Sequence, residues 1–255
     1  IKEFFDNQNG KSLLIESDYQ TISKIAFLHK ITDNIVLDKT LDNIIGSLRI
    51  VKDEYELENI KKAQKITDDA FSHILSFIKP GVCEKDLALE IEFFMKKNGA
   101  EGVSFDLITI SGKNTSLPHG VPSEKLLESG DFITMDIGCK VNGYCSDMTR
   151  TVALKFATDE MKKVYNTVLE AQKLALKTVK SGIFASQVDK AARDYINESG
   201  FEGCFGHATG HGVGLFIHEA PTVSTKSETV LKPNMVITIE PGIYLKNKFG
   251  VRIED

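Results

Sequence analysis

The chain has 255 residues, of which 42% are hydrophobic and 26% charged, and its formal net charge is −5. This length allows one large domain, or one domain with part of another, and the composition is typical of a globular protein. Acidic and basic residues are interspersed, which argues against a nucleic-acid partner, and no apolar run is long enough to cross a bilayer, which argues against a membrane partner.

The first residues, Ile1-Lys2-Glu3-Phe4, show neither an initiator methionine nor a signal-peptide pattern. We therefore expect this chain to come from inside a longer protein. Its four cysteines form no CxxC pair, so we expect reduced thiols in a cytoplasmic protein rather than disulfides or a thiolate zinc site. These cysteines are Cys83, Cys139, Cys145 and Cys204.

Four helices are predicted after residue 50. Residues 1–50 contain only short apolar patches, too few for a core of their own, and are expected to be the end of a truncated domain. From Asp53, apolar residues recur every three or four positions until Pro80-Gly81 ends the pattern, which predicts a long amphipathic helix. The other three helices are predicted over Glu84–Lys97, Asp159–Val179 and Ser186–Ser199, the last ended by Gly200.

Strand-like segments lie between and after these helices without a strict alternation of strand and helix. This order favours an α+β fold, with a curved, mostly antiparallel sheet, over a doubly wound parallel sheet. The predicted strands are Ser104–Ile110, Phe132–Cys139, Thr149–Phe156, Met235–Ile239 and Gly250–Ile253.

Four carboxylates and one imidazole lie in apolar or glycine-rich surroundings in the second half of the chain. A buried carboxylate needs a compensating cation, and four of them exceed what nearby arginines could neutralise. A pair of divalent metal ions would supply that charge, which favours a hydrolase over a binding module. The five residues are Asp136, Asp147, His211, Glu240 and Glu254.

The dipeptide Asn142-Gly143 is the strongest short signal for a β-hairpin. A two-residue turn there sets Asp136 opposite Thr149 and places Asp136 and Asp147 on one face as diagonal neighbours. Two carboxylates so placed would repel each other unless a cation lay between them. The alternative is a solvent-facing hairpin with two incidental acids.

Glu240 and Glu254 form a second possible pair of acids across a turn. A five-residue loop over Lys246–Gly250 would put both on one face of the strands, whereas a four-residue loop would not. The alternative is a pair of edge acids.

The segment Gly206–Glu219 contains three histidines and four glycines. Glycines at this density indicate a backbone that passes close to another part of the protein. With His119, which lies in Leu117-Pro118-His119-Gly120, the site is expected to hold four histidines: His119, His207, His211 and His218. The alternative is a glycine-rich loop with surface histidines.

Arginine is rare here, and a rare arginine can mark a position that needs bidentate contact with a carboxylate. The chain has four, and two of them are close in sequence to the proposed ligands: Arg150 follows Asp147, and Arg252 precedes Glu254.

Taken together, these motifs resemble the pita-bread metallopeptidases, family M24, and within them the Xaa-Pro branch of aminopeptidase P and prolidase. The resemblance covers about residues 50–255. The motifs that carry it are Asp136, Asp147, Gly210–Gly214, His218-Glu219, Ile239–Tyr244 and Val251–Asp255.

The resemblance implies a role for each residue. Asp136 would chelate one metal ion, Asp147 and Glu254 would bridge two, and His211 and Glu240 would complete the coordination of the second. Glu240 would also pass a proton to the leaving proline nitrogen, while His119 and His218 would hydrogen-bond the substrate. The resemblance makes His207 and Tyr244 pocket residues, and Arg252 the support of a ligand carboxylate.

The implied fold is a pita-bread domain over residues 51–255, without its C-terminal end, preceded by the remnant of a smaller N-terminal α/β domain and a linker over residues 1–50. The implied cofactors are two divalent ions, Mn²⁺ first, with Co²⁺ or Zn²⁺ as alternatives. The implied partners are peptides with proline in second position, and a homodimer is expected for the full-length protein.

Many prolidases carry an arginine a few residues after the histidine that matches His218, and here the stretch is Glu219-Ala220-Pro221-Thr222-Val223. We therefore predict an Xaa-Pro aminopeptidase acting on longer peptides, with an Xaa-Pro dipeptidase as the alternative. A methionine aminopeptidase shares the five ligand types, but the Glu-Pro-Gly-Ile-Tyr run and the N-terminal segment argue against it. A non-catalytic pita-bread binding protein or a metal-free creatinase would not need all five ligands.

Overall fold

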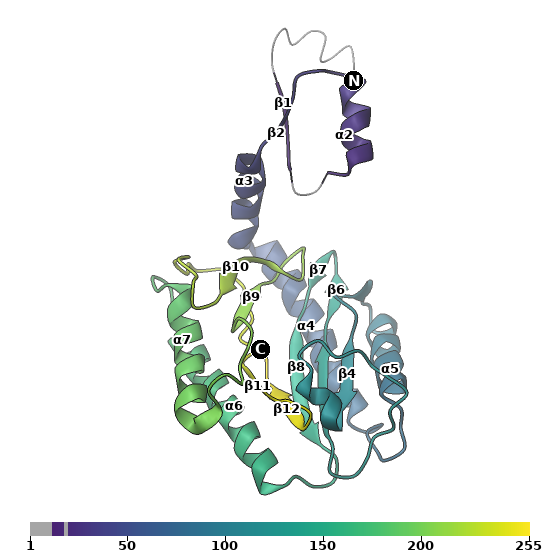
Figure 1. Ribbon diagram of the computed structural model, residues 1–255. Coiled ribbons are helices and arrows are strands. Elements are labelled where there is room, and N and C mark those ends of the chain that lie inside the picture. The colour runs from purple at the N-terminus through teal and green to yellow at the C-terminus, as the bar shows by residue number, and fades with distance from the viewer. Residues whose placement is uncertain (1–11, 18–19) are drawn as a thin grey trace. The chain divides into compact units, whose positions relative to one another are not determined.

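The computed structural model of the chain describes residues 12–17 and 20–255 and divides into two compact units, residues 1–49 and 50–255 (Figure 1). The interpretation of the first unit as part of a truncated domain stays a prediction. The opening residues Ile1–Phe4 lie outside the described residues. No helix among the described residues has both the length and the apolar character needed to span a membrane.

The described part of the first unit is a small βαβ arrangement. Strand β1, Leu13–Ile15, pairs in parallel with β2, Ile35–Leu37, and helix α2, Ile22–His29, connects them. The hydroxyl of Thr21 accepts a hydrogen bond from the amide of Lys24 and so caps α2. Helix α3, Lys39–Ile50, then leads to the second unit.

Four helices of the second unit agree with the predicted ones. Asp53 and Glu56 form a reciprocal capping box at the start of the first of them. That helix ends at Ile74, earlier than the apolar pattern suggests. The pattern continues to Ile78 because this residue packs against the same hydrophobic cluster from beyond the end of the helix. The helices are α4 (Glu54–Ile74), α5 (Glu84–Lys97), α6 (Asp159–Thr178) and α7 (Ala185–Ile196), and the one-turn segment η2 (Asn197–Phe201) follows α7.

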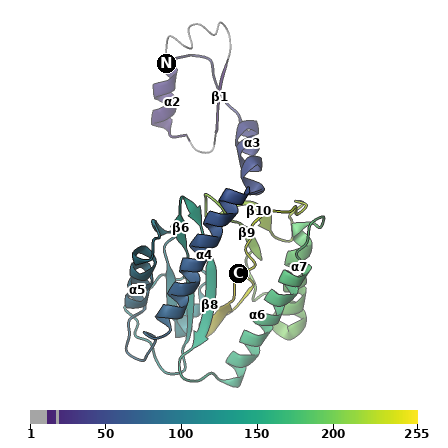
Figure 2. The ribbon, with the colours of Figure 1, turned by 180° about the vertical axis from the view of Figure 1, so that it is seen from behind.

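All strand pairs in the second unit are antiparallel, which confirms the predicted α+β class, but the strands form several short sheets. Their orders are β3-β6-β7, β4-β5-β8, β10-β9 and β11-β12. Helices α4 and α5 pack beside β6 and β4, whereas α6 and α7 pack beside β12 and β10 (Figures 1 and 2). The strands are β3 (Gly102–Val103), β4 (Ile108–Ser111), β5 (Phe132–Ile137), β6 (Cys139–Val141), β7 (Tyr144–Cys145), β8 (Met148–Ala153), β9 (Gly210–Gly212), β10 (Glu219–Val223), β11 (Gly242–Leu245) and β12 (Phe249–Arg252).

Three strand predictions are wrong in part. The strand predicted over Thr149–Phe156 ends at Ala153. Met235–Ile239 forms only isolated bridges, since Asn234 has a positive φ of 65° before it and Pro241 has no amide hydrogen to extend a ladder after it. Within Ser104–Ile110, regular pairing begins at Ile108. The hydroxyl of Ser104 instead donates to the carbonyls of Cys139 and Ser146.

Strand β5 separates two hydrophobic clusters because successive side chains point to opposite faces. Ile133, Met135 and Ile137 belong to the cluster with α4 and α5, whereas Phe132 belongs to the cluster with α6, α7, β11 and β12. Asp136 shares the face of Phe132. The strand therefore directs this acid into the space between the two halves of the unit.

Candidate metal centre

The hairpin register places Asp136 and Asp147 as predicted. Asn142 and Gly143 form a two-residue turn, both with positive φ (48° and 81°), between Val141 and Tyr144. Asp136 pairs with Thr149, in the same register as the turn. The two acids are therefore diagonal neighbours on one face.

Glu240 and Glu254 also oppose each other, although the loop has neither of the two lengths left open by the sequence. The pair Leu245 and Phe249 closes a three-residue loop, and a three-residue loop has the same parity as the five-residue loop considered above. The pairing continues beyond the strands, where the amide of Ile239 donates to the carbonyl of Asp255 at 2.8 Å. This register sets Glu240 directly opposite Glu254.

His211 lies on β9 between two glycines that leave no room for side chains. A Cβ atom on Gly210 would lie 1.9 Å from the carbonyl oxygen of Thr238, and one on Gly212 would lie 2.2 Å from that of Ala220. The prediction of a backbone squeezed against neighbouring segments is thereby confirmed. The squeeze fixes the strand from which the imidazole of His211 projects.

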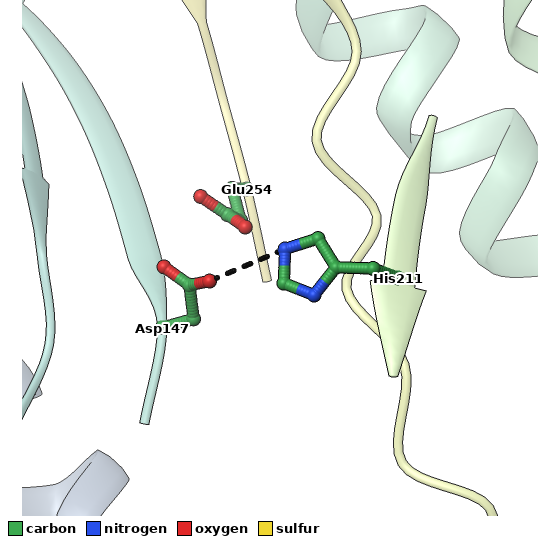
Figure 3. A group of neighbouring side chains, drawn as sticks. All are labelled: Asp147, His211 and Glu254. Carbon is green, nitrogen blue, oxygen red and sulfur yellow. Dashed lines mark ion pairs between the residues drawn. The ribbon is translucent and has the colours of Figure 1, made fainter. Parts of the chain in front are cut away.

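Asp147, His211 and Glu254 point toward one another from three separate segments (Figure 3). One ligand atom from each lies within 4.8 Å of the others. The Nε2 atom of His211 lies 3.5 Å from Asp147 Oδ2 and 3.4 Å from Glu240 Oε1. Its Nδ1 lies 3.0 Å from the carbonyl of Gly212, which can only accept, so Nδ1 carries the hydrogen and Nε2 offers a lone pair.

The carboxylates are buried together with too little positive charge. Burial, and then the neighbouring acids, raise the pKa of Asp147 and of Glu254 well above their usual range. Burial raises the pKa of Glu240 to about 7, although Arg252 opposes this rise. The Oδ1 atom of Asp136 is buried and has no hydrogen-bond partner among the residues that the structure describes. Oxygen donors with one imidazole fit hard divalent ions, so this donor set suits the implied metals.

Arg252 is the buried cation of the site and contacts several of its members. Its guanidinium donates to Asp136 Oδ2 at 2.6 Å and to the hydroxyl of Tyr244 at 2.8 Å. It also donates to Thr149 Oγ1 and to the carbonyl of Pro118. These bonds orient one carboxylate oxygen of Asp136 and leave the other, Oδ1, for an ion.

The same contacts determine the state of His207. Its Nδ1 donates to the carbonyl of Ala208, so its Nε2 must accept, and the hydroxyl of Tyr244 donates to it at 2.9 Å. Burial lowers the pKa of His207 to about 4, which keeps the ring neutral. Both nitrogens of His207 are thus engaged with the protein, and the ring forms part of the wall.

A cavity of ≈ 230 Å³ brings together all the candidate residues except Tyr244, which lies behind Arg252 and His207. The rings of His211 and His218 are 4.4 Å apart at their centroids. Phe105 and Thr222 also line the cavity and were not predicted as site residues. The sequence gives no indication that either residue belongs to the site. Phe105 lies in a segment predicted as a strand, and Thr222 lies in a stretch noted only for its lack of arginine.

Comparison with known proteins identifies the family of the chain. The model of metallopeptidase family M24 matches residues 58–255. An uncharacterized peptidase of Bacillus subtilis, YqhT, is 48% identical over 211 residues, which are 83% of this chain and 60% of that protein. The chain thus spans less than two thirds of the length of this relative.

Two solved structures superpose on almost the whole chain. An Xaa-Pro dipeptidase from Bacillus anthracis has a TM-score of 0.94 at 45% identity, covering 100% of this chain and 72% of its own. An X-Pro aminopeptidase from Thermotoga maritima has a TM-score of 0.92 at 40% identity, covering 99% and 72%. The chain belongs to metallopeptidase family M24, with the α+β pita-bread fold expected from its motifs.

Proposed function

We propose that the protein is a metal-dependent exopeptidase that hydrolyses the peptide bond before proline, with Xaa-Pro dipeptides as its first substrate class. The observation that carries this proposal is the convergence of five ligand-type side chains in one cavity: Asp136, Asp147, His211, Glu240 and Glu254. The dipeptidase is placed ahead of the aminopeptidase predicted from the sequence because the dipeptidase structure is the more similar of the two.

Each residue has a proposed task in this reaction. Asp136, Asp147, His211, Glu240 and Glu254 would hold two divalent ions, Mn²⁺ first and Co²⁺ or Zn²⁺ as alternatives. Such ions supply Lewis acidity, which polarises a carbonyl and lowers the pKa of water. Glu240 would hold the proton that reaches the proline nitrogen. His119 and His218 would donate hydrogen bonds to the substrate carbonyl.

Action on longer peptides is the second candidate, and one feature of the cavity favours it. Thr222 lines this cavity, and the stretch Glu219–Val223, where many prolidases have an arginine, contains none. Among the described residues, Arg252 is the only lysine or arginine that lines the cavity, and it is already bound to Asp136. The free carboxylate of a dipeptide would therefore meet no unpaired lysine or arginine among the described residues that line this cavity. In a longer peptide this position is an uncharged amide, which needs no cation.

The test compares Xaa-Pro with Xaa-Pro-Xaa peptides after chelation and addition of Mn²⁺ or Co²⁺, with the released first residue measured by chromatography. We expect metal-dependent release from Xaa-Pro, and faster release from the tripeptide would favour the second candidate. If neither peptide shows metal-dependent release of its first residue, the proposed function is ruled out. Equal cleavage of Met-Ala peptides would favour a methionine aminopeptidase. A cytoplasmic location and a homodimeric full-length protein stay predictions.

A further inference from the structure

A single buried carboxylate, that of Glu84, holds both ends of the segment that carries His119. Glu84 is the first residue of α5, and none of its surface is exposed. At the end of β4, the amide and hydroxyl of Ser111 donate to Oε1 at 2.6 and 2.9 Å. Twelve positions later, the amide and hydroxyl of Ser123 donate to Oε2 at 3.0 and 2.7 Å.

The charge of Glu84 is therefore compensated by donors from this one segment. The side-chain amide of Asn114 adds a further contact at 3.2 Å. The nearby Lys125 donates to Ser111 Oγ and pairs with Asp131 rather than with Glu84. Hydrogen bonds to an ionised group are about twice as strong as neutral ones. Displacing the segment would leave a buried carboxylate without partners, so the segment is held firmly.

The middle of the segment enters the cavity. Pro118 and His119 both line it, and the carbonyl of Pro118 accepts a hydrogen bond from Arg252 at 3.1 Å. Throughout residues 12–17 and 20–255, no hydrogen bond to the imidazole of His119 is found. Its position is thus set by the backbone between Ser111 and Ser123, whose two ends bind Glu84.

We propose that Glu84 is a positioning residue for His119: its carboxylate clamps the two ends of segment 111–123 and thereby sets where the imidazole meets the substrate. The kinetic part of this inference rests on the proposed function. The structural part does not, because the clamp exists whether or not the protein cleaves peptides.

The principal variant is Glu84→Gln. Its side-chain NH₂ group cannot accept the hydrogen bonds that one carboxylate oxygen of Glu84 now accepts. In the full chain with Mn²⁺, we expect kcat/KM for an Xaa-Pro peptide to fall by at least about tenfold, since displacing a catalytic group lowers the reaction rate by at least this factor. Metal stoichiometry should not change, because no proposed ligand lies in the segment. In the His119→Ala background, the same change should cost less than about twofold, because the two residues act as a unit.

A second measurement is independent of activity. Hydrogen exchange of the amides in residues 112–122 should become faster in Glu84→Gln, while α7 stays unchanged. The matched control is Glu90→Gln on the same helix, which changes a half-buried contact between Glu90 Oε1 and His73 Nε2 (2.6 Å) and should alter neither measurement. If Glu84→Gln does not fold, Ser123→Ala removes one donor to the carboxylate and should give the same pattern at about threefold in kcat/KM.

Unchanged exchange of residues 112–122 would overturn the inference whatever the activity. Effects of Glu84→Gln and His119→Ala that multiply would also overturn it, because Glu84 would then act elsewhere. An inactive wild-type protein would remove the proposed function, and the exchange result would still decide whether the clamp exists.

Discussion

At the scale of single residues, the carboxylate of Asp147 carries a charge that is hard to accommodate without a cation. It is almost fully buried beside Asp136 and Glu240, and its pKa is raised well above the usual range by burial and by these acids. We predict that Asp147→Asn abolishes high-affinity metal binding. In chelated protein the same variant should be at least as stable as the wild type, because a buried like charge is removed.

The measurements for Asp147→Asn are metal content by mass spectrometry and thermal unfolding with and without chelator. Glu170→Gln, on the exposed face of α6 and paired there with Lys173, is the control. Wild-type metal stoichiometry in Asp147→Asn would contradict its role as a bridge.

Glu240 gives a prediction for pH dependence in the metal-free protein. Its pKa in the folded state is about 7, against an ordinary value of 4.5. Between these values the folded state binds more protons than the unfolded state, so this group lowers stability as the pH rises through that window. The free energy of unfolding of Glu240→Gln, relative to that of the wild type, should therefore be higher at pH 8 than at pH 5, by on the order of 3 kcal/mol. Urea unfolding of both chelated proteins checks this, and a difference of opposite sign would contradict it.

At the scale of elements, β9 is confined between two neighbouring carbonyls. We predict that Gly212→Ala displaces β9, because its Cβ would meet the backbone oxygen of Ala220 at 2.2 Å, and that metal affinity falls at least tenfold through His211. Gly206→Ala, four residues before β9 and with nothing within 4 Å of its added Cβ, is the matched control. Isothermal titration with Mn²⁺ compares the two, and equal affinities would show that β9 tolerates the shift.

Local rules made parts of this site predictable. Asn142-Gly143 determines a two-residue turn, so the Asp136–Asp147 face follows by counting, and only the parity of the β11–β12 loop was needed to pair Glu240 with Glu254. Strands β9 and β10 could not be predicted, because their glycines and a proline oppose strand propensity and they form only by packing on neighbours.

Contacts between segments far apart in sequence were still harder to predict from the sequence. The bond from Tyr244 to His207 and the clamp at Glu84 depend on loop paths that no periodicity encodes. The bond from Arg252 to Tyr244, in contrast, joins neighbouring positions of the β11–β12 hairpin. The rarity of arginine and the family resemblance both pointed toward Arg252.

At the scale of the whole molecule, the candidate metal centre lies where two hydrophobic clusters of the second unit meet. Asp136 comes from β5, which also supplies the cluster with α4 and α5. Glu240 and Glu254 adjoin Ile239 and Ile253 of the cluster with α6 and α7. Ions bound by ligands from both sides would therefore join the two halves as well as neutralise their acids.

This position predicts how the full chain responds to metal. Because folded protein binds the ions and unfolded protein has no site, Mn²⁺ at one hundred times its Kd should add about 2.7 kcal/mol per site to the free energy of unfolding. Hydrogen exchange should slow in both halves, in β5 and β8 as well as in β11 and β12, since the ligands tie them together. Asp147→Asn should show neither effect. Slowing in only one half would mean that the ions bind without joining the two clusters, and would contradict the shared site.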